Sequence, residues 1–475
     1  MILLALLATP LLGAALSWIL TNLRARRVVA VAGPVLVILV GLRLVVLTRH
    51  GVVTTPATGR VDALSALLVV LVGVMGLLAG LRLGRVLTDS ERRAGRRYGA
   101  LVQLFLAAML GALVTANLGV LWLMIELTTV ATSFLVAHRG HAKALEASWK
   151  YVVLCSLGIA VALLGLVIIY FASAHVARGG APTLDLTHLR DLGTRLNGPV
   201  VQLGGALALV GFATKVGLAP LHTWLPDAHS QAPAPVSGLM SGVLLAVALY
   251  ALIRVKSVVD AVLGASFSRD LLVVLALGSL VVAVIFLLAT QDLKRLLAYS
   301  SMEHLALATL AVAAGTPLAL AAALFHVMGH GLVKSSVFHS AGEIVDREGT
   351  SDLGALRGIL RGGDPAGRRL AVGVLALVGF PPFSLFLSEL LMTRAEFRAG
   401  LGVVASVQVL LAVGAGVVTL WNLWPVFLGE RSTESVVGSR RWSVPGVSLG
   451  ASVLLALVGG SFGALLLHAS TGVLS

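Results

Sequence analysis

Charge and cysteine are both scarce in this chain of 475 residues. Charged residues make up 12% of it, against about 25% in soluble globular proteins, whereas 58% of the residues are hydrophobic. A water-soluble protein of this length needs more polar surface. The single cysteine, Cys155, excludes a disulfide framework, and it excludes an iron–sulfur cluster or thiolate zinc site formed by this chain alone. The composition predicts a polytopic membrane protein.

Phosphate-binding loops are also missing. The sequence contains no GxxxxGK[ST] loop and no GxGxxG after a predicted strand, so nothing indicates a nucleotide site. The segment GHGLVKS (329–335) is a chance partial match inside an apolar helix. The net charge of +14 fits the basic cytoplasmic loops of a membrane protein, and we expect no nucleic-acid partner.

Fourteen apolar stretches have about the 20 residues that cross a bilayer as an α-helix. Because the first one runs directly into the basic segment NLRARR (22–27), we expect a membrane anchor there rather than a cleaved signal peptide. The predicted spans are approximately 2–20, 28–47, 63–81, 99–116, 118–137, 150–172, 200–219, 235–253, 271–290, 296–313, 317–342, 370–393, 402–428 and 446–467.

The basic residues orient these spans. If the connection after the first span is cytoplasmic, most of the 35 Lys and Arg residues fall in cytoplasmic loops, as the positive-inside rule requires. They include the arginines between 82 and 97 and Arg431, Arg440 and Arg441. With an even number of spans, both termini then lie on the outer side of the cell (plasma) membrane. The longest connections are an outer loop at 173–199 and a cytoplasmic loop at 343–369.

Glu126 lies in the middle of an apolar span, LWLMIELTTVATSFL (121–135). A charge at the centre of a bilayer costs roughly 2.5–3.5 kcal/mol on insertion scales, so a carboxyl there needs a reason. It either stays protonated and stabilises helix contacts, or it carries a proton during ion transfer. We favour proton transfer.

Lys215 is the second such residue, and Pro220 interrupts its span. Three further prolines follow, which predicts a broken helix; at membrane depth this is tolerated only where it is buried or lines a hydrated cavity. A buried lysine can gain and lose a proton near neutral pH, whereas snorkelling to the interface is difficult from so central a position. His222, Asp227 and His229 follow the break and are either residues of an ion path or caps at the interface.

The third place is the segment HVMGHGLVKSSVFH (326–339). His326, His330 and Lys334 are spaced i, i+4 and i+8, so they lie on one face of a helix. A polar stripe in an apolar helix predicts a hydrated proton relay, and a purely structural polar seam is the alternative. Two histidines four residues apart can also bind zinc, but the sequence offers no HExxH glutamate and no third nearby ligand. We therefore expect no metal.

Glu389 lies in a second span that prolines interrupt, ALVGFPPFSLFLSELLM (376–392). Two broken spans, each with one buried ionisable residue and five spans apart, predict a repeat that is inverted in the membrane. The expected fold is all-α, with about 14 transmembrane helices, two inverted repeats and two broken helices. The residues alone indicate an ion-translocating membrane protein with a relay near the midplane.

The repeats suggest four segments. Residues 1–98 would contain the first three spans, residues 99–256 the first inverted repeat, residues 270–428 the second inverted repeat, and residues 429–475 the last span.

Several segments resemble the proton-channel subunits shared by respiratory complex I, group 4 membrane-bound hydrogenases and multisubunit cation/proton antiporters. The resemblance covers nearly the whole chain and is most specific over 119–392. Within the family, 149–165 and 235–254 are most similar to the hydrogenase-4 component F group. The segments that carry the resemblance are LWLMIEL, KVGLAPLHTWLPDAHSQAPAPVSGLM (215–240), QDLKRLLAYSSMEH (291–304), HVMGHGLVKSSVFHSAG (326–342) and GFPPFSLFLSE (379–389).

The resemblance implies a role for each buried residue. Glu126 and Lys215 would form an ion pair whose opening drives proton release in the first half-channel. Lys334, with the two histidines before it, would be the central relay, and Glu389 would end the second half-channel. The chain would bind no cofactor itself. Its partners would be other membrane-arm subunits and a soluble redox arm with iron–sulfur clusters and, in a hydrogenase, nickel–iron.

The sequence departs from the family at Ser241, where the largest antiporter-like subunit of complex I commonly has a histidine. Glu303 and His304 can supply protonatable groups there, or they can pair with Lys294 and Arg295 at the cytoplasmic edge. We favour pairing at the edge. The long lateral helix of that largest subunit is not expected after the fourteenth span.

Three functions compete. The first is a proton-translocating subunit of a hydrogenase-4-like or complex I-like (NADH-quinone oxidoreductase-related) complex. The second is a subunit of a multisubunit Na⁺/H⁺ antiporter without redox partners, and the third is a scaffold that no longer conducts. A scaffold gains nothing from four costly ionisable residues in the membrane, which argues against the third function. Of the other two we expect the first.

Overall fold

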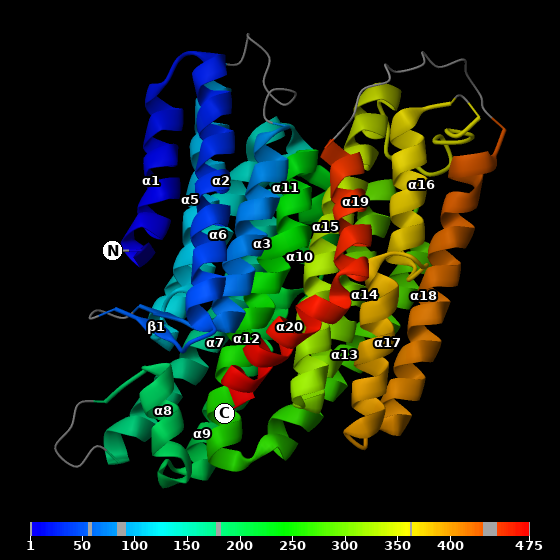
Figure 1. Cartoon of the computed structure of the whole chain (residues 1–475). Coiled ribbons are helices and arrows are strands. Elements are labelled where there is room, and N and C mark those ends of the chain that lie inside the picture. The colour runs from blue at the N-terminus through cyan, green and yellow to red at the C-terminus, as the bar shows by residue number, and fades with distance from the viewer. Residues whose placement is uncertain are drawn as a thin grey trace.

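The computed structural model describes residues 2–55, 59–82, 92–176, 182–361, 363–430 and 444–474. They form an almost entirely helical bundle in which most helices run side by side (Figure 1). The predicted all-α class is confirmed. Some basic residues that orient the predicted spans, namely Arg85, Arg431, Arg440 and Arg441, lie outside the described residues.

A short hairpin connects the second and third helices, where antiparallel strands pair Val53 with Val61. Asn22 and Asp62 cap the helices that follow them, because each side chain accepts a hydrogen bond from a backbone N–H of the first turn. The elements are α1 (Ile2–Ile19), α2 (Leu23–Thr48), β1 (Val53–Thr54), β2 (Arg60–Val61), α3 (Ala63–Gly80) and α5 (Arg92–Leu113).

The next elements contain the first predicted break. One helix ends at Gly217, whose φ of 92° is the left-handed conformation that glycine favours at a helix end, and the chain becomes helical again only at Trp224. The elements are α6 (Leu118–Val136), η2 (Ala137–Arg139), α7 (Ala142–Val176), α8 (Leu186–Leu192), η3 (Gly193–Arg195), α9 (Gly198–Val216), α10 (Trp224–Gln231), α11 (Ala234–Leu239), the π-helical turn η4 (Met240–Leu244) and α12 (Leu245–Leu263).

The second break lies in the predicted span 370–393. The helix stops at Leu377 and a new one starts at Ser384, because Pro381 and Pro382 have no N–H to continue it. The remaining elements are α13 (Ala265–Ala289), α14 (Leu293–Ala314), α15 (Pro317–Glu348), α16 (Pro365–Leu377), α17 (Ser384–Arg398), α18 (Gly402–Leu428), α19 (Val444–Leu457) and α20 (Gly459–Leu474).

Each predicted span coincides with a helix or with an interrupted pair of helices. Among the described residues, 11 helices are individually long and apolar enough to cross a membrane. The remaining three predicted spans are 99–116, 370–393 and 446–467. They correspond to α5, which begins with basic turns, and to the pairs α16–α17 and α19–α20.

The interior of the bundle is built around α15, which packs against α11, α14, α16, α17, α19 and α20. The apolar windows of α14 and of the continuous stretch α11–α12 are completely buried, whereas a third or less of the residues in those of α1, α2, α13 and α18 are buried. The exposed helices suit contact with lipid or with other membrane subunits. The ionisable residues considered below come mainly from the interior.

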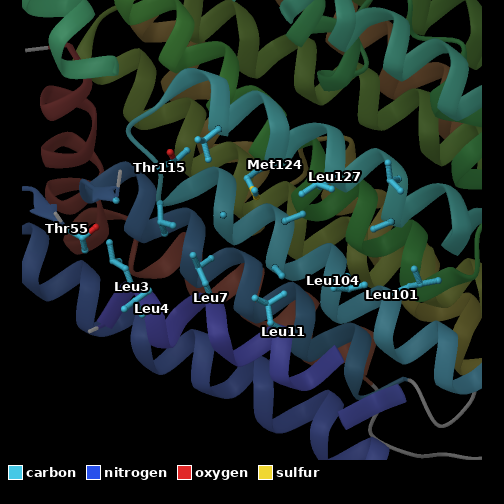
Figure 2. A pocket seen from close by; sticks show the side chains of 18 of the residues that line it. Leu3, Leu4, Leu7, Leu11, Thr55, Leu101, Leu104, Thr115, Met124 and Leu127 are labelled. Atoms are coloured by element: carbon cyan, nitrogen blue, oxygen red, sulfur yellow. The ribbon is translucent and has the colours of Figure 1, made fainter. Parts of the chain in front are cut away.

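A large apolar hollow, about 840 Å³, lies at the edge of the bundle and does not belong to this interior. Figure 2 shows Leu7 and Leu11 of α1, Leu104 of α5 and Leu127 of α6 lining it. None of its lining residues is ionisable. It therefore offers no ionisable group for proton transfer.

Candidate proton-relay site

Lys215 is the centre of a first polar cluster. It lies in the last turn of α9 with a side chain that is 0% exposed. Its Nζ donates hydrogen bonds to Thr129 Oγ1 at 2.8 Å and to Tyr151 OH at 2.6 Å, and it lies 4.7 Å from the centre of the Tyr151 ring. The lysine therefore does not snorkel, and its charge is held by hydroxyl groups and an aromatic face.

Glu126 of α6 joins this cluster indirectly. Its carboxylate accepts hydrogen bonds from Thr129 Oγ1 at 3.2 Å and from Ser156 Oγ at 2.5 Å. The Thr129 hydroxyl therefore accepts from Lys215 and donates to Glu126, so the implied ion pair is bridged rather than direct. Sequence reasoning missed Thr129, Tyr151 and Ser156. Thr129 had a visible signal, because it lies three residues after Glu126 on the same helix face.

The broken helix leaves backbone groups at membrane depth, and neighbouring side chains satisfy them. Trp224 Nε1 donates to the Thr214 carbonyl at 3.0 Å, and the Ala219 N–H donates to Ser279 Oγ at 2.9 Å. The break is thus stable in the interior of the bundle, where it ends α9 one residue after Lys215.

The three residues after the break have different surroundings. Asp227 lines a polar hollow of about 660 Å³ and forms ion pairs with Arg295 at 2.6 Å and Lys150 at 3.8 Å. The His222 ring packs beside Phe286, and its Nδ1 donates to the Pro220 carbonyl at 3.2 Å. Of the two roles that the sequence left open for Asp227, its surroundings are those of a cap at the interface.

His229 is fully buried, which excludes an interfacial cap. Its ring lies 6.4 Å from Trp224 and 5.5 Å from Phe338 of α15. Nδ1 donates to the Leu225 carbonyl at 2.8 Å, and Nε2 has no hydrogen-bond partner among the described residues. His229 therefore lies between the Lys215 cluster and α15.

Serine hydroxyls connect the π-helical turn η4 to the second cluster. Ser241 Oγ lies 2.8 Å from Ser301 Oγ, and Ser301 donates to the Leu297 carbonyl at 3.0 Å. Lys334, which is 0% exposed, donates to the same carbonyl at 2.8 Å. Ser241, at the position where the family resemblance predicts a histidine, is therefore part of a polar connection toward Lys334.

Three imidazole rings form the second cluster. The centres of the His326 and His330 rings each lie 5.1 Å from that of His304 in α14. His304 Nδ1 and His326 Nε2 form a hydrogen bond of 3.2 Å. The two histidines of the expected stripe on α15 therefore lie close together, and His304 of the neighbouring helix α14 packs against both.

The second broken helix contributes Ser388 and Glu389 from α17. His326 Nδ1 lies 2.9 Å from Ser388 Oγ, which donates its own proton to the Leu385 carbonyl at 2.8 Å. His326 is therefore the donor to Ser388. Glu389 Oε1 lies 3.8 Å from His304 Nδ1, and the glutamate side chain is 27% exposed.

The predicted pairing of Glu303 and His304 at the cytoplasmic edge is wrong. Lys294 donates to the carbonyls of Ser230 and Ala232, and Arg295 pairs with Asp227. Glu303 is about nine residues deeper along α14, roughly 14 Å at the helical rise, where its carboxyl interacts with Lys334. The acid is held in the interior by the buried lysine.

Glu396 is a further buried carboxyl that sequence reasoning missed. It lies seven residues after Glu389 on α17 and is 0% exposed. Gln408 of α18 interacts with it, but no donor among the described residues reaches either oxygen with normal hydrogen-bond geometry. The i to i+7 spacing from Glu389 was a visible signal.

Comparison with known proteins identifies the family. Residues 115–414, which contain both clusters, match the model described as "NADH:quinone oxidoreductase/Mrp antiporter, TM". The chain belongs to this family. Members of this antiporter-type family with high similarity include the "Hydrogenase-4 component F homolog" of Methylacidiphilum infernorum, which is 36% identical over 72% of this chain and 71% of the relative.

Two further relatives show the range of the antiporter-type family. A Na(+)/H(+) antiporter subunit of Bacillus subtilis is 27% identical over 71% of this chain and 67% of its own length. A chain of the membrane-bound sulfane sulfur reductase, an archaeal respiratory membrane complex, superposes with a TM-score of 0.90 at 25% identity. That match covers 100% of this chain and 98% of the other. The polytopic fold is therefore that of a membrane subunit of this family.

Proposed function

We propose that this chain is a proton-translocating membrane subunit of a hydrogenase-4-like or complex I-like respiratory complex. The observation that carries the proposal is the pair of buried polar clusters, each beside a broken helix, with the buried His229 between the first cluster and α15. Electron transfer would take place in partner subunits that carry iron–sulfur clusters and, in a hydrogenase, nickel–iron. The partners would be other membrane-arm subunits and a redox arm, as in the complexes of similar chains.

The connections suggest an order for the proton path. Glu126, Thr129 and Lys215 would form the first half-channel, and His229 would lie on the route to Lys334 through the interior. From Lys334 the proton would pass through the histidine cluster to Glu389, whose side chain is partly exposed. Every step joins groups that gain and lose protons, or hydroxyls that relay them.

Electrostatic coupling would link the two clusters. Lys215 and Lys334 are completely buried, and interactions between charges are stronger in a medium of low dielectric constant than in water. Loss of a proton by one lysine therefore changes the energy of charging the other. A small movement of Thr129 would separate Lys215 from Glu126 and start this change.

We also propose the repeat organisation and orientation of the predicted segments. Residues 99–256 and 270–428 would be the inverted repeats, because each contains one broken helix, and residues 1–98 and 429–475 would flank them. The chain would lie in the plasma membrane with both termini outside. The C-terminal end and α8, which belongs to the predicted outer loop, lie toward the same end of the bundle (Figure 1).

Proton pumping by membrane vesicles tests the relay. In Lys215→Ala we expect pumping to fall to background while the complex still assembles. Thr129→Val should lower it by roughly 10- to 150-fold, since a hydrogen bond to a charged group contributes about 1.5–3 kcal/mol. Thr129→Ser keeps the hydroxyl and should pump normally, as should Lys143→Ala at an exposed position. Undiminished pumping by Lys215→Ala would falsify the relay.

The similarity to an antiporter subunit supports a second candidate, a cation/proton antiporter without redox partners. Mass spectrometry of the intact complex, purified through a tag on this chain, distinguishes the two. Co-purified nickel–iron and iron–sulfur subunits would support a hydrogenase-4-like pump, and flavin-containing subunits would support a complex I-like one. Small membrane subunits alone, without metal, would support the antiporter.

A further inference from the structure

The meeting point of His304, His326 and Glu389 has the geometry of a metal site. His304 Nδ1 and His326 Nε2 are 3.2 Å apart, and Glu389 Oε1 is 3.8 Å from His304 Nδ1. One ligand atom from each residue lies within 4.8 Å of the others. Ligands of tetrahedral zinc at Zn–N distances of about 2.0–2.1 Å are separated by roughly 3.3 Å. Small shifts of Glu389 would complete three of the four positions.

We infer that this cluster binds a divalent transition-metal ion such as Zn²⁺ from solution, and that the bound ion blocks the relay. Binding follows from the ligand set alone, whereas the block depends on the proposed proton function. The ion would be an inhibitor and not a resident cofactor. Sequence reasoning considered zinc on His326 and His330. The structure instead places His304 beside His326 and adds the carboxylate of Glu389.

The protonation of His326 favours metal binding. Because Ser388 donates its proton to the Leu385 carbonyl, it can only accept from His326 Nδ1. The proton of a neutral His326 is therefore on Nδ1, and Nε2 presents a lone pair to the cluster. Metal-binding histidines commonly have their other nitrogen held in this way by a second group.

The broken helix provides a similar partner for His304. In a continuous helix the Leu377 carbonyl would accept the N–H of residue 381, but Pro381 has none. The Leu377 backbone interacts with the His304 ring, whose Nε2 makes no hydrogen bond of normal geometry to the described residues. In the free protein His304 Nδ1 therefore carries the proton that it donates to His326 Nε2. On metal binding this proton would move to Nε2, toward Leu377, and Nδ1 would bind the ion.

Charge and access also suit a cation. Glu303 is close enough to Glu389 to interact with it electrostatically, so two carboxylates can offset the double charge of the ion. Lys334 opposes the cation and interacts with Glu303. A metal would therefore compete with the protonated lysine for the carboxylate of Glu303. The partly exposed side chain of Glu389 gives the ion a way in.

Zinc content of the purified complex tests binding without reference to pumping. The complex is stripped with a chelator, equilibrated with Zn²⁺ and measured by elemental mass spectrometry per copy of this chain. We expect His326→Ala and Glu389→Gln each to bind one ion fewer than the wild type. Glu396→Gln, which removes a buried carboxyl on the same helix outside the cluster, should retain it. Equal zinc content in the wild type and in both ligand variants would overturn the site.

Ser388→Ala tests the hydrogen bond behind His326. It should weaken zinc binding by about 10- to 100-fold, the usual effect of losing such a partner. In proteoliposomes, Zn²⁺ should stop pumping by the wild type, and Ser388→Ala should need a correspondingly higher concentration. Zinc bound at the site with pumping unchanged would overturn the block. If the complex binds zinc but never pumps, the site stands and the proposed function fails.

Discussion

Single hydroxyl and carbonyl groups decide how the buried ionisable residues are connected. Thr129 joins Lys215 to Glu126, and Ser388 fixes the proton of His326. Such groups cost little to bury when they are hydrogen-bonded, whereas an unpaired charge costs far more. The chain therefore holds Lys215 and His326 in its interior by placing small polar groups beside them.

Asp364 is a residue of the connection 343–369 whose charge stabilises the fold. Burial alone would raise the pKa of its carboxyl. Hydrogen bonds from Arg347 at 2.7 Å and from the N–H groups of Ala366 and Gly367 outweigh burial and lower the pKa below its ordinary value of 3.8. The carboxylate caps α16 and pairs with the last turn of α15.

We predict that Asp364→Ala lowers the free energy of unfolding by about 1 kcal/mol, the typical value of an N-cap. Because the pKa is lower in the folded state, the wild type has the full benefit above about pH 4 and loses it as the pH falls through the lower, folded-state pKa. Thermal unfolding of the purified protein at several pH values checks this. The gap between variant and wild type should close in acid, and Asp270→Ala, at an exposed position, should show no gap. A gap that persists at low pH would contradict the assignment.

At the residue scale, the sequence predicted ionisable positions better than their partners. Glu126, Lys215, Lys334 and Glu389 are conspicuous because charge is rare in apolar spans. Their contacts come from other helices: Lys215 meets Tyr151, 64 positions away. The residues next to Lys215 in the sequence give no sign of a contact with so distant a residue. For the same reason Glu303 was assigned to the nearest basic residues in the sequence, although Lys334 is its neighbour in the fold.

At the scale of elements, the two broken helices were predictable because proline cannot donate a backbone hydrogen bond. The contacts that backbone groups make at each break were not predictable. The Thr214 carbonyl accepts a hydrogen bond from Trp224 Nε1 at the first break, and the Leu377 backbone interacts with the His304 ring at the second. The short α8 and the π-helical turn η4 also had no clear signal, since their residues fit an ordinary apolar pattern.

One buried ion pair ties α3 to α12. Arg254 Nη2 donates to both carboxylate oxygens of Asp62, at 2.7 and 2.6 Å, and to Ser65 Oγ at 3.1 Å. Both charged side chains are almost completely buried, with 4% and 7% exposed. Sequence analysis did not single out either residue, because both lie at the ends of predicted spans, where charges are common.

We predict that Asp62→Ala lowers the free energy of unfolding by roughly 3–5 kcal/mol, because it leaves the Arg254 guanidinium buried without its partner. Asp62→Ala combined with Arg254→Met should recover most of this loss. The exposed pair of Arg269 and Asp270 is the matched control, since such pairs contribute about 0–1 kcal/mol. Thermal unfolding in detergent compares the wild type, Asp62→Ala, the double variant and a variant that breaks the control pair. If the double variant is no more stable than Asp62→Ala, the loss does not come from the uncompensated charge.

At the scale of the whole molecule, the structure forms one continuous interior from two broken helices. His229 packs against Phe338 of α15, and the Ser241–Ser301 contact leads to the carbonyl that holds Lys334. These contacts lie in the buried interior and not on the outer surface of the bundle. This arrangement explains why α14 and the stretch α11–α12 are fully buried while the outer helices are not.

The orientation of this interior in the membrane can be tested with cysteine labels, because Cys155 is the one cysteine of the chain and is buried. In a Cys155→Ser background we place single cysteines at two exposed positions, Thr471→Cys near the C-terminus and Ala355→Cys in the connection 343–369. If both termini are outside, a membrane-impermeant maleimide should label Thr471→Cys in intact cells. It should reach Ala355→Cys only after the cells are permeabilised.

Each other labelling pattern would contradict a different part of the predicted topology. The reverse pattern would place the basic loops outside, against the positive-inside rule, and would reverse the proposed direction of proton release at Glu389. Labelling of both positions from the same side would mean that an even number of spans separates them. The topology predicts three spans between these positions, so the fourteen-span arrangement would then be wrong after residue 369, where the second broken helix and Glu389 lie.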